Sequence, residues 1–472
     1  MADPLWSLGE VLVATGGECA GDPATSVAGF SIDSRGLAAG EGFIAIHGEN
    51  RDGHDFVEAA LEKNAACAVV EEAFPKGDEA RLVRVIDTFD ALNDLGRAGR
   101  ARAERAAVIA VTGSAGKTGT KEALRVALSP SGTVHASSKS FNNHWGVPLT
   151  LANMPRDVTY GVFEVGMNHA GEIDALTRLV RPHIAIVTTV APVHLGFFKS
   201  VEEIADAKAE IFHGLEPGGT AVINRDNPHY ARLAAHARKQ GAETVSFGEA
   251  EDADARLLSC ELSPDGSAVT ADILGETVAY RIGAPGRHVV QNSLAVLATA
   301  RLAGADLTKA ADALGQVEAQ AGRGQRFVIE TKAGPVAIVD ESYNANPASM
   351  RAALSTLGLT PRNAYKRRVA VLGDMLELGN EGPRLHRELA EAVDGARVDV
   401  VFACGELMAS LFQALPEACR GAYAKTSEEL APKLLEGVRP GDIIMVKGSL
   451  GSRMAPLVEA LKGRFEAESV SA

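Results

Sequence analysis

A ten-residue segment, 111–120, holds the residues of this chain that are most suited to binding an anion; its sequence is Val-Thr-Gly-Ser-Ala-Gly-Lys-Thr-Gly-Thr. Its glycines let backbone N–H groups approach phosphate oxygens, Lys117 supplies a cation for terminal phosphates, and the hydroxyl of Thr118 suits Mg²⁺. This combination predicts a loop that holds the phosphates of a nucleotide. The predicted phosphate-binding residues are Gly113, Ser114, Ala115, Gly116, Lys117, Thr118 and Gly119.

The segments on either side would position this loop. The apolar run 108–111 is typical of a buried strand, and 121–128 has the pattern of a helix, whose positive dipole end would face the anion. The standard phosphate-loop pattern has glycine where this chain has Val111, so a chance Gly-Lys-Thr loop is the alternative. The strand–loop–helix setting favours the nucleotide site.

Two further side chains lie at the ends of predicted strands in the same region. Glu164 belongs to the apolar run 161–165, and His194 follows the run 184–187. The carboxyl ends of parallel strands meet at one edge of an open α/β sheet, where ligands bind. Together with Thr118 they predict a Mg²⁺ site at that edge, since Mg²⁺ prefers oxygen ligands. Each residue alone is equally well explained as a satisfied polar group at a strand end.

Two polar strings in the first third of the chain are candidates for substrate contacts. In Asp-Ser-Arg, 33–35, the guanidinium and hydroxyl could bind a diphosphate or a uracil edge, and a solvated turn is the alternative. The string Phe-Asn-Asn-His-Trp-Gly-Val-Pro-Leu-Thr, 141–150, predicts a rigid polar loop with amide donors. Turn chemistry would explain its two asparagines but not the whole string.

Other candidate residues carry weaker local signals. Lys208 lies in an amphipathic helical pattern, where it reads simply as a surface charge. Asn292 could bind an adenine edge or cap a helix, and Arg326, after the linker 322–324, could reach the phosphates across a domain cleft. Polar strings that follow strands of the last third indicate a site on one edge of that sheet; they are 340–347, 372–379 and 447–449.

The composition limits the class of protein. The chain has 472 residues, 46% hydrophobic and 23% charged, which is typical of a globular protein too long for one core. A net charge of −14 argues against a broad nucleic-acid surface, so an anionic ligand needs specific local cations. The five cysteines form no Cys-x-x-Cys pair, which favours reduced thiols in a cytoplasm. The N-terminus lacks a signal peptide's basic region, and prolines and histidines break the apolar stretch 181–199, which argues against a membrane span.

The order of strand-like and helix-like runs predicts three α/β domains, with boundaries at 1–106, 107–320 and 321–472. The first is small, the second is a P-loop-type, mostly parallel sheet with helices on both faces, and the third is Rossmann-like. The polar tail after Gly463 is expected to fray.

Taken in order, these strings resemble the Mur ligases, the ATP-dependent amide-forming enzymes of bacterial peptidoglycan synthesis. The resemblance covers nearly the whole chain, and the loop at 112–118 is similar to a family variant that accounts for Val111. Tyr-Asn-Ala-Asn-Pro at 343–347 stands where the tripeptide-forming members carry Asp-Tyr-Ala-His. This difference, with Leu-Gly-Asp-Met-Leu-Glu-Leu-Gly at 372–379, favours the member that adds a dipeptide.

The resemblance implies ATP- and Mg²⁺-dependent ligation of D-alanyl-D-alanine to UDP-N-acetylmuramoyl-tripeptide through an acyl phosphate. It implies that the three domains serve UDP-sugar-peptide binding, ATP binding and ligation in that order, and that Lys117 and Thr118 hold the γ-phosphate and Mg²⁺. The implied metal ligands and catalytic groups are Glu164, His194 and, if carbamylated by CO₂, Lys208. The implied nucleotide contacts are Asn292, Arg326, Asp340 and Asn344, and the implied UDP-substrate contacts are Ser34, Arg35, Asn142 and Asn143.

Three other functions remain open on the sequence. The preceding ligase step, which adds diaminopimelate or lysine, is disfavoured by residues 343–347. Folylpolyglutamate synthetases resemble the second and third domains but lack the first, and Asp33-Ser34-Arg35 argues against them. The chain could also be an NTP-driven binding module without ligation. The leading expectation is a monomeric cytoplasmic enzyme with two small-molecule substrates, no nucleic-acid partner and ATP bound between the second and third domains.

Overall fold

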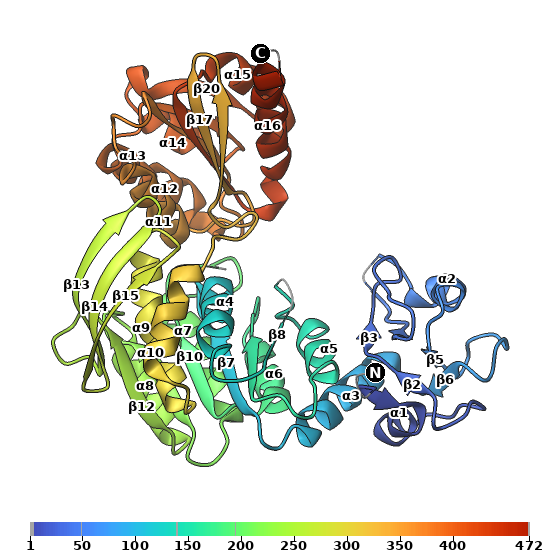
Figure 1. Ribbon diagram of the computed structural model, residues 1–472. Helices are drawn as coiled ribbons and strands as arrows, with labels where there is room; N and C mark the ends of the chain where they lie inside the picture. The colour runs from blue at the N-terminus through green and yellow to red at the C-terminus, as the bar shows by residue number, and fades with distance from the viewer. Residues whose placement is uncertain (1–3, 49, 138–139, 194, 471–472) are drawn as a thin grey trace.

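The computed structural model describes residues 4–48, 50–137, 140–193 and 195–470, and it divides into three domains (Figure 1). In the first, a parallel sheet of order β3-β4-β5-β6 stands beside a small antiparallel pair, β1-β2. Its elements are β1 (Trp6–Ser7), α1 (Leu8–Thr15), β2 (Ser26–Val27), β3 (Phe30–Ser31), β4 (Gly42–Ile44), η1 (Gly53–Phe56), α2 (Val57–Glu62), β5 (Cys67–Glu71), β6 (Leu82–Val85) and α3 (Thr88–Arg102).

The central domain is built on a nine-stranded sheet of order β15-β14-β13-β12-β11-β10-β7-β9-β8. Its strands run parallel from β8 to β13, and β13, β14 and β15 form an antiparallel extension. The elements are β7 (Ala107–Thr112), α4 (Lys117–Leu128), β8 (Val134–Ala136), α5 (Gly146–Ala152), β9 (Tyr160–Glu164), α6 (Glu172–Val180), β10 (Ile184–Val187), α7 (Val201–Ala209), η2 (Glu210–Gly214), β11 (Thr220–Asn224), α8 (Tyr230–Lys239), β12 (Glu243–Gly248), β13 (Ala255–Ser263), β14 (Gly266–Ile273), β15 (Glu276–Ile282), α9 (Arg287–Leu302), α10 (Leu307–Ala313) and η3 (Leu314–Gln316).

The central strands are apolar throughout because helices cover both faces of their sheet. Along β7, Ile109 and Val111 pack into the core beneath α4 and α9, while Val108 and Ala110 pack into the opposite core with α6 and α7. Successive side chains of a strand point to opposite faces, so a strand buried on both sides needs an unbroken apolar run. The unbroken apolar run 108–111 therefore indicates a strand that is buried on both faces.

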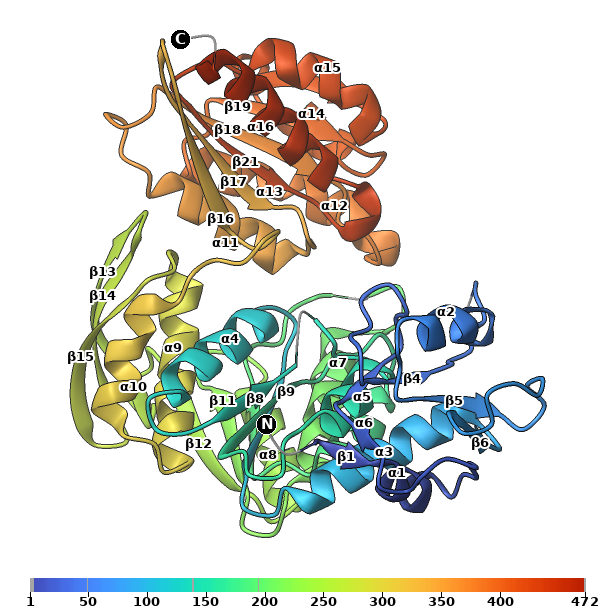
Figure 2. The ribbon, with the colours of Figure 1, turned by 45° about the vertical axis from the view of Figure 1, so that its right-hand side comes forward.

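The C-terminal domain has a six-stranded sheet of order β16-β17-β21-β18-β19-β20, parallel except for β16 (Figure 2). Its elements are β16 (Gln325–Thr331), β17 (Gly334–Glu341), α11 (Pro347–Gly358), β18 (Arg367–Gly373), η4 (Gly379–Glu381), α12 (Gly382–Arg387), α13 (Leu389–Gly395), β19 (Val400–Cys404), α14 (Ala409–Ala414), η5 (Glu417–Cys419), β20 (Arg420–Ala424), α15 (Ser427–Gly437), β21 (Asp442–Lys447), η6 (Leu450–Ser452) and α16 (Ala455–Val470).

The predicted fold class is confirmed, with two local differences. The expected fraying after Gly463 is wrong, because α16 continues to Val470 and buries Phe465 against the sheet. The phosphate-loop helix begins at Lys117, four residues before the expected start. The boundaries near 106 and 320 stay a proposal, supported by breaks between α3 and β7 and between η3 and β16. In the described part of the chain, no helix has the length and apolar character needed to cross a bilayer.

The first two domains are joined by close helix packing rather than by the chain alone. Gly96 and Gly99 of α3 lie directly against α5, and a Cβ at Gly99 would come within 2.2 Å of the Leu151 carbonyl oxygen. Arg100, which is buried, donates to the carbonyls of Val180 and Arg181 in the central domain. Glycine at these positions lets two helix backbones approach, and the contact fixes the first domain against the second.

Substituting Gly99→Ala should therefore loosen this junction. The added methyl group forces α3 away from α5, at a cost of at least about 1–3 kcal/mol in the free energy of unfolding. Urea unfolding followed by circular dichroism measures the effect. The matched control is Gly463→Ala in α16, where a Cβ meets nothing within 4 Å; it should stabilise by about 0.5–1 kcal/mol, because alanine favours helix over glycine. Equal midpoints for the two variants would contradict the packing argument.

Candidate functional site

The phosphate loop is held from one side by the segment that follows β10. Ser114 Oγ donates to the Ala191 carbonyl at 3.1 Å and accepts from the Ala191 N–H at 3.0 Å. Thr188 Oγ1 donates to the Ala115 carbonyl at 2.6 Å. Gly113 has φ 148°, and a Cβ there would lie 1.9 Å from Thr188 Oγ1. Only glycine fits at position 113, so the shape of the phosphate loop depends on the segment after β10 that packs against it.

Three side chains meet at the carboxyl ends of β7 and β9. Thr118 Oγ1 donates to Glu164 Oε2 at 2.8 Å, and Asn142 Nδ2 donates to Glu164 Oε1 at 2.7 Å. Thr118 and Glu164 are buried. The hydroxyl and the carboxylate are hard oxygen donors that fit Mg²⁺, which would take the place of the hydrogen bond between them. The sequence predicts that Thr118 and Glu164 share a Mg²⁺ site, whereas Asn142 is predicted to contact the UDP substrate.

Two lysines with lowered pKa values lie at this site: Lys208 is buried, and Lys117 is half-buried. Lys117 Nζ donates to the Gly113 carbonyl at 2.8 Å. Burial lowers the pKa of Lys117; the nearby carboxylate of Glu164 opposes this shift and the guanidinium of Arg323 adds to it. Burial, and then the charge of Lys117, lowers the pKa of Lys208 on α7 well below its usual value. Lys208 is therefore no solvated surface charge, and the local sequence interpretation is wrong.

The C-terminal domain supplies polar groups to the same site. Asn346 Nδ2 donates to the Ser114 carbonyl of the phosphate loop at 3.3 Å. Arg323 Nη2 donates to Ser140 Oγ at 3.1 Å, and its guanidinium lies over the Tyr343 ring, 4.2 Å from the centroid. Neither Arg323 nor Asn346 is among the sequence-predicted site residues. Each belongs to a string that the sequence does single out, the glycine linker and the Tyr-Asn-Ala-Asn-Pro segment.

Arg326, the arginine that the sequence favours for the phosphates, has other partners. Its guanidinium donates to Asp265 at 2.9 Å and to the Tyr365 hydroxyl at 3.1 Å. Asp265 lies in the turn between β13 and β14, so this ion pair ties the C-terminal domain to the antiparallel extension of the central sheet. Arg323, by contrast, lies close enough to Lys117 for its positive charge to help lower the pKa of that lysine.

Of the other predicted nucleotide contacts, Asn292 and Asn344 line the same cleft as the phosphate loop. A Cβ at Gly116 would come within 2.5 Å of the Asn292 amide nitrogen, so Asn292 faces the phosphate loop. The capping alternative for Asn292 is wrong, because α9 begins at Arg287. Asp340 accepts from the N–H groups of Gly322 and Ser342, at 2.9 and 3.0 Å, and shapes the linker. The Asn344 carbonyl accepts from Lys447 at 3.0 Å.

Of the predicted UDP-substrate contacts, Asn142 and Asn143 line the same cleft as Lys117, whereas Ser34 and Arg35 lie outside its lining. Arg35 is exposed and pairs with Asp33, whose pKa its hydrogen bonds lower to about 2. The Ser34 carbonyl accepts from Lys63 at 2.7 Å. Asn143 Oδ1 accepts from the Gly146 N–H at 2.9 Å and so shapes the start of α5. His194 lies outside the described residues.

A cleft of about 1970 Å³ opens beside the phosphate loop. It is lined by residues from all three domains, among them Arg51, His144, Lys117, Glu164, Arg323 and Lys447. A typical small-molecule pocket has roughly 300–1,000 Å³. This cleft therefore has room for a nucleotide and a second substrate together. The fold and the cleft define a three-domain α/β protein whose P-loop-type segment opens into a cleft lined by all three domains.

Comparison with known proteins gives this class a family. Models of the Mur ligase family catalytic domain, the Mur ligase middle domain and the Mur ligase glutamate ligase domain match residues 26–100, 111–300 and 322–450. UDP-N-acetylmuramoyl-tripeptide–D-alanyl-D-alanine ligase of Rickettsia prowazekii is 32% identical over 429 residues, 91% of this chain and 94% of that protein. The chain belongs to the Mur ligase family.

Solved structures agree with the sequence match. The crystal structure of MurF from Acinetobacter baumannii superimposes with a TM-score of 0.84 at 30% identity, covering 98% of this chain and 99% of that one. MurF from Thermotoga maritima in complex with ADP gives 0.76 at 25% identity, covering 93% and 98%. The three-domain fold is thus shared across the whole chain.

The low pKa of Lys208 makes a prediction about stability. Its folded-state pKa lies well below the usual 10.5, so the unfolded chain binds more protons between those two values. The free energy of unfolding should therefore rise with pH across this window, by at most about 1.4 kcal/mol per pH unit. Lys208→Met should lose this rise in CO₂-free buffer, measured by denaturant unfolding at several pH values.

The control for this experiment is Lys239→Met at an exposed position of α8. Its stability curve should run parallel to that of the unsubstituted chain, because an exposed lysine is solvated in both states. If the Lys208→Met curve is also parallel, the ammonium of Lys208 is not desolvated in the folded protein.

Proposed function

We propose that this chain ligates D-alanyl-D-alanine to UDP-N-acetylmuramoyl-tripeptide with hydrolysis of ATP to ADP and phosphate. The product is the UDP-N-acetylmuramoyl-pentapeptide used in peptidoglycan synthesis. The observation that carries the proposal is the cluster of Lys117, Thr118 and Glu164 opening into a cleft large enough for two substrates. The relatives of that name, which match over nine-tenths of the chain, support the choice of substrates.

The chemistry follows from what these residues can hold. A carboxylate acylates poorly, so the terminal carboxylate of the tripeptide first attacks the γ-phosphorus of ATP, and ADP leaves. The Lys117 ammonium and the loop's N–H groups offset charge on the transferring phosphoryl group, so catalysis consists mainly of positioning and electrostatics. The amine of D-alanyl-D-alanine then attacks the acyl phosphate, the amide bond forms and phosphate leaves.

We assign the Mg²⁺ site to Thr118 and Glu164, with His194 as a further proposed ligand. When bound, Mg²⁺ would offset charge on the β- and γ-phosphates. Lys208 joins this site if it is carbamylated. Burial lowers its pKa and so favours the neutral amine, whose nitrogen can attack CO₂, form an N–C bond and release a proton. The carbamate would place near Lys117 an anion that suits a metal.

The acyl phosphate must be protected from water. The groups that cross from the C-terminal domain, Asn346 and Arg323, are placed to cover the phosphate loop. Asn292, Asp340, Asn344 and Arg326 are proposed to line the nucleotide's surroundings in the same cleft, where Arg326 acts by tying two domains together. Closure over bound ATP brings these groups to the reacting phosphate.

The first domain and its junction with the second are proposed to hold the UDP end of the donor. The cleft reaches this region through Asn50, Arg51 and the aromatic pair His144 and Trp145. Ser34, Arg35 and Asn143 remain proposed contacts for the same substrate, and the exposed Arg35 can leave Asp33 for a phosphate. We propose that the enzyme works as a cytoplasmic monomer.

The test is phosphate release from ATP and Mg²⁺, with UDP-N-acetylmuramoyl-tripeptide and D-alanyl-D-alanine added singly and together. Release that needs both substrates, with the pentapeptide identified by mass, is the expected result. Turnover with UDP-N-acetylmuramoyl-dipeptide and a diamino acid instead would move the chain to the preceding step. Tight ATP binding without turnover for either pair would favour a nucleotide-driven binding module.

The two arginines after the glycine linker allow a sharper test. Arg323→Gln should lower kcat/KM for ATP by about 10–100-fold, because it removes a charged contact beside the phosphate loop. Arg326→Gln, whose partners are Asp265 and Tyr365, should lower it by less than about 3-fold. Steady-state phosphate release at varied ATP measures both. A larger effect at Arg326 would restore the sequence-based assignment.

A further inference from the structure

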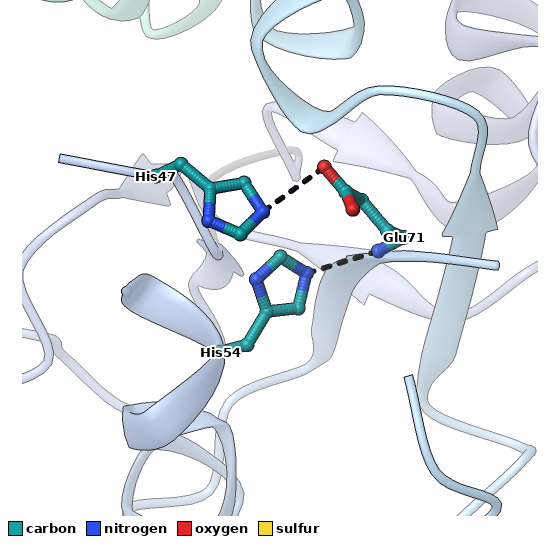
Figure 3. A group of neighbouring side chains, drawn as sticks. All are labelled: His47, His54 and Glu71. Atoms are coloured by element: carbon teal, nitrogen blue, oxygen red, sulfur yellow. Dashed lines mark hydrogen bonds and ion pairs between the residues drawn. The ribbon is translucent and has the colours of Figure 1, made fainter. Parts of the chain in front are cut away.

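A second cluster of metal-ligating side chains lies in the first domain, at the carboxyl ends of β4 and β5. His47 follows β4, His54 lies in η1, and Glu71 ends β5. One ligand atom of each lies within 4.8 Å of those of the other two. In Figure 3 both imidazole rings present a nitrogen to Glu71. The mechanism proposed above uses none of the three.

The carboxylate of Asp52 organises the two rings from the opposite side. Its Oδ1 lies 2.7 Å from His54 Nδ1 and 3.2 Å from His47 Nδ1. His54 Nε2 accepts the Glu71 N–H at 3.1 Å, so the proton of neutral His54 sits on Nδ1 and points to Asp52. The Nε2 atoms of both rings therefore face Glu71, since His47 Nε2 lies 3.1 Å from Glu71 Oε1.

The pairing of both Nδ1 atoms with Asp52 is a feature that metal-binding histidines share. A ligating imidazole donates its other ring N–H to a carboxylate, which fixes the tautomer and the ring orientation. Here one carboxylate, that of Asp52, lies beside both rings; His47 Nε2 lies at the Glu71 carboxylate, and His54 Nε2 lies at the backbone N–H of the same residue. Two histidines and one carboxylate are a recurring ligand set for Zn²⁺ and related ions.

We propose that His47, His54 and Glu71 bind a divalent transition-metal ion of the Zn²⁺ type, with Asp52 as the hydrogen-bond partner of both imidazoles. Ligand atoms on a tetrahedral Zn²⁺ lie about 3.3 Å apart, so the farthest pair must close by roughly 1.5 Å. The side chains of His47 and Glu71 are 52% and 31% exposed and can make this movement. The ion replaces the Glu71 N–H as the partner of His54 Nε2.

The site has a structural connection to the main cleft. Gly48, Asn50 and Arg51, in the segment between His47 and Asp52, line that cleft. An ion held by His47 on one side and by Glu71 on the other would tie this segment to the end of β5. The inference does not depend on the ligase reaction, since it rests on the first domain's own side chains.

The experiment is a Zn²⁺ titration of the full chain after chelator treatment, in excess Mg²⁺ so that hard-cation sites are filled, with a competing zinc indicator as readout. One equivalent should bind. His47→Gln and Glu71→Gln should each lose it or weaken it at least about 100-fold, and Asp52→Asn should weaken it about 10–100-fold. Circular dichroism checks that each variant is folded.

The matched control is His236→Gln. This substitution also removes an imidazole that pairs with a carboxylate, that of Asp206 at 3.0 Å, but it lies outside the proposed metal site. Its zinc binding should equal that of the unsubstituted chain. Zinc anomalous scattering from crystals should place the ion between His47, His54 and Glu71. Absence of a bound equivalent, or one that survives in both His47→Gln and Glu71→Gln, would overturn the proposal.

Discussion

Two neighbouring lysines, the buried Lys208 and the half-buried Lys117, impose the electrostatic requirement that organises this molecule. Charged ammonium groups are costly to bury, and the charge of Lys117 adds to the desolvation that already lowers the pKa of Lys208. Such a site favours anions: the carboxylate of Glu164 is already present, and phosphate oxygens or a carbamate would add to it. The chain carries a net charge of −14, so the local cations, not the overall field, must attract a polyphosphate.

The three domains relate to this site in different ways. The first is fixed to the second by backbone-close packing of α3 on α5, which requires Gly96 and Gly99. The third reaches it through individual polar contacts, Asn346 to Ser114 and Gly196 N–H to the Glu377 carbonyl at 2.9 Å. Polar contacts of this kind exchange readily with water and ligand. The third domain is therefore the one suited to move over bound ATP.

Much of the fold could be predicted because its signals are local. The unbroken apolar runs of β7, β9, β10 and β11 indicate strands buried on both faces. The residue types of the loop at 111–120 indicate phosphate binding. The site was harder to predict. Asn142 and Asn143 are adjacent and chemically identical, yet one binds Glu164 and the other shapes α5. Arg323 and Arg326 are likewise the same residue type within three positions, yet one guanidinium reaches Ser140 and the other reaches Asp265.

The fold class, the phosphate loop and the family could be predicted from the sequence, because each depends on contiguous residues whose spacing has a direct physical meaning. Which polar side chains share a site could be seen only in the folded chain. Folding buried Lys208 beside Lys117, turned Arg323 instead of Arg326 toward the loop, and brought His47, His54 and Glu71 together around Asp52. The reason is that burial and charge proximity depend on elements far apart in the chain, which no local pattern encodes.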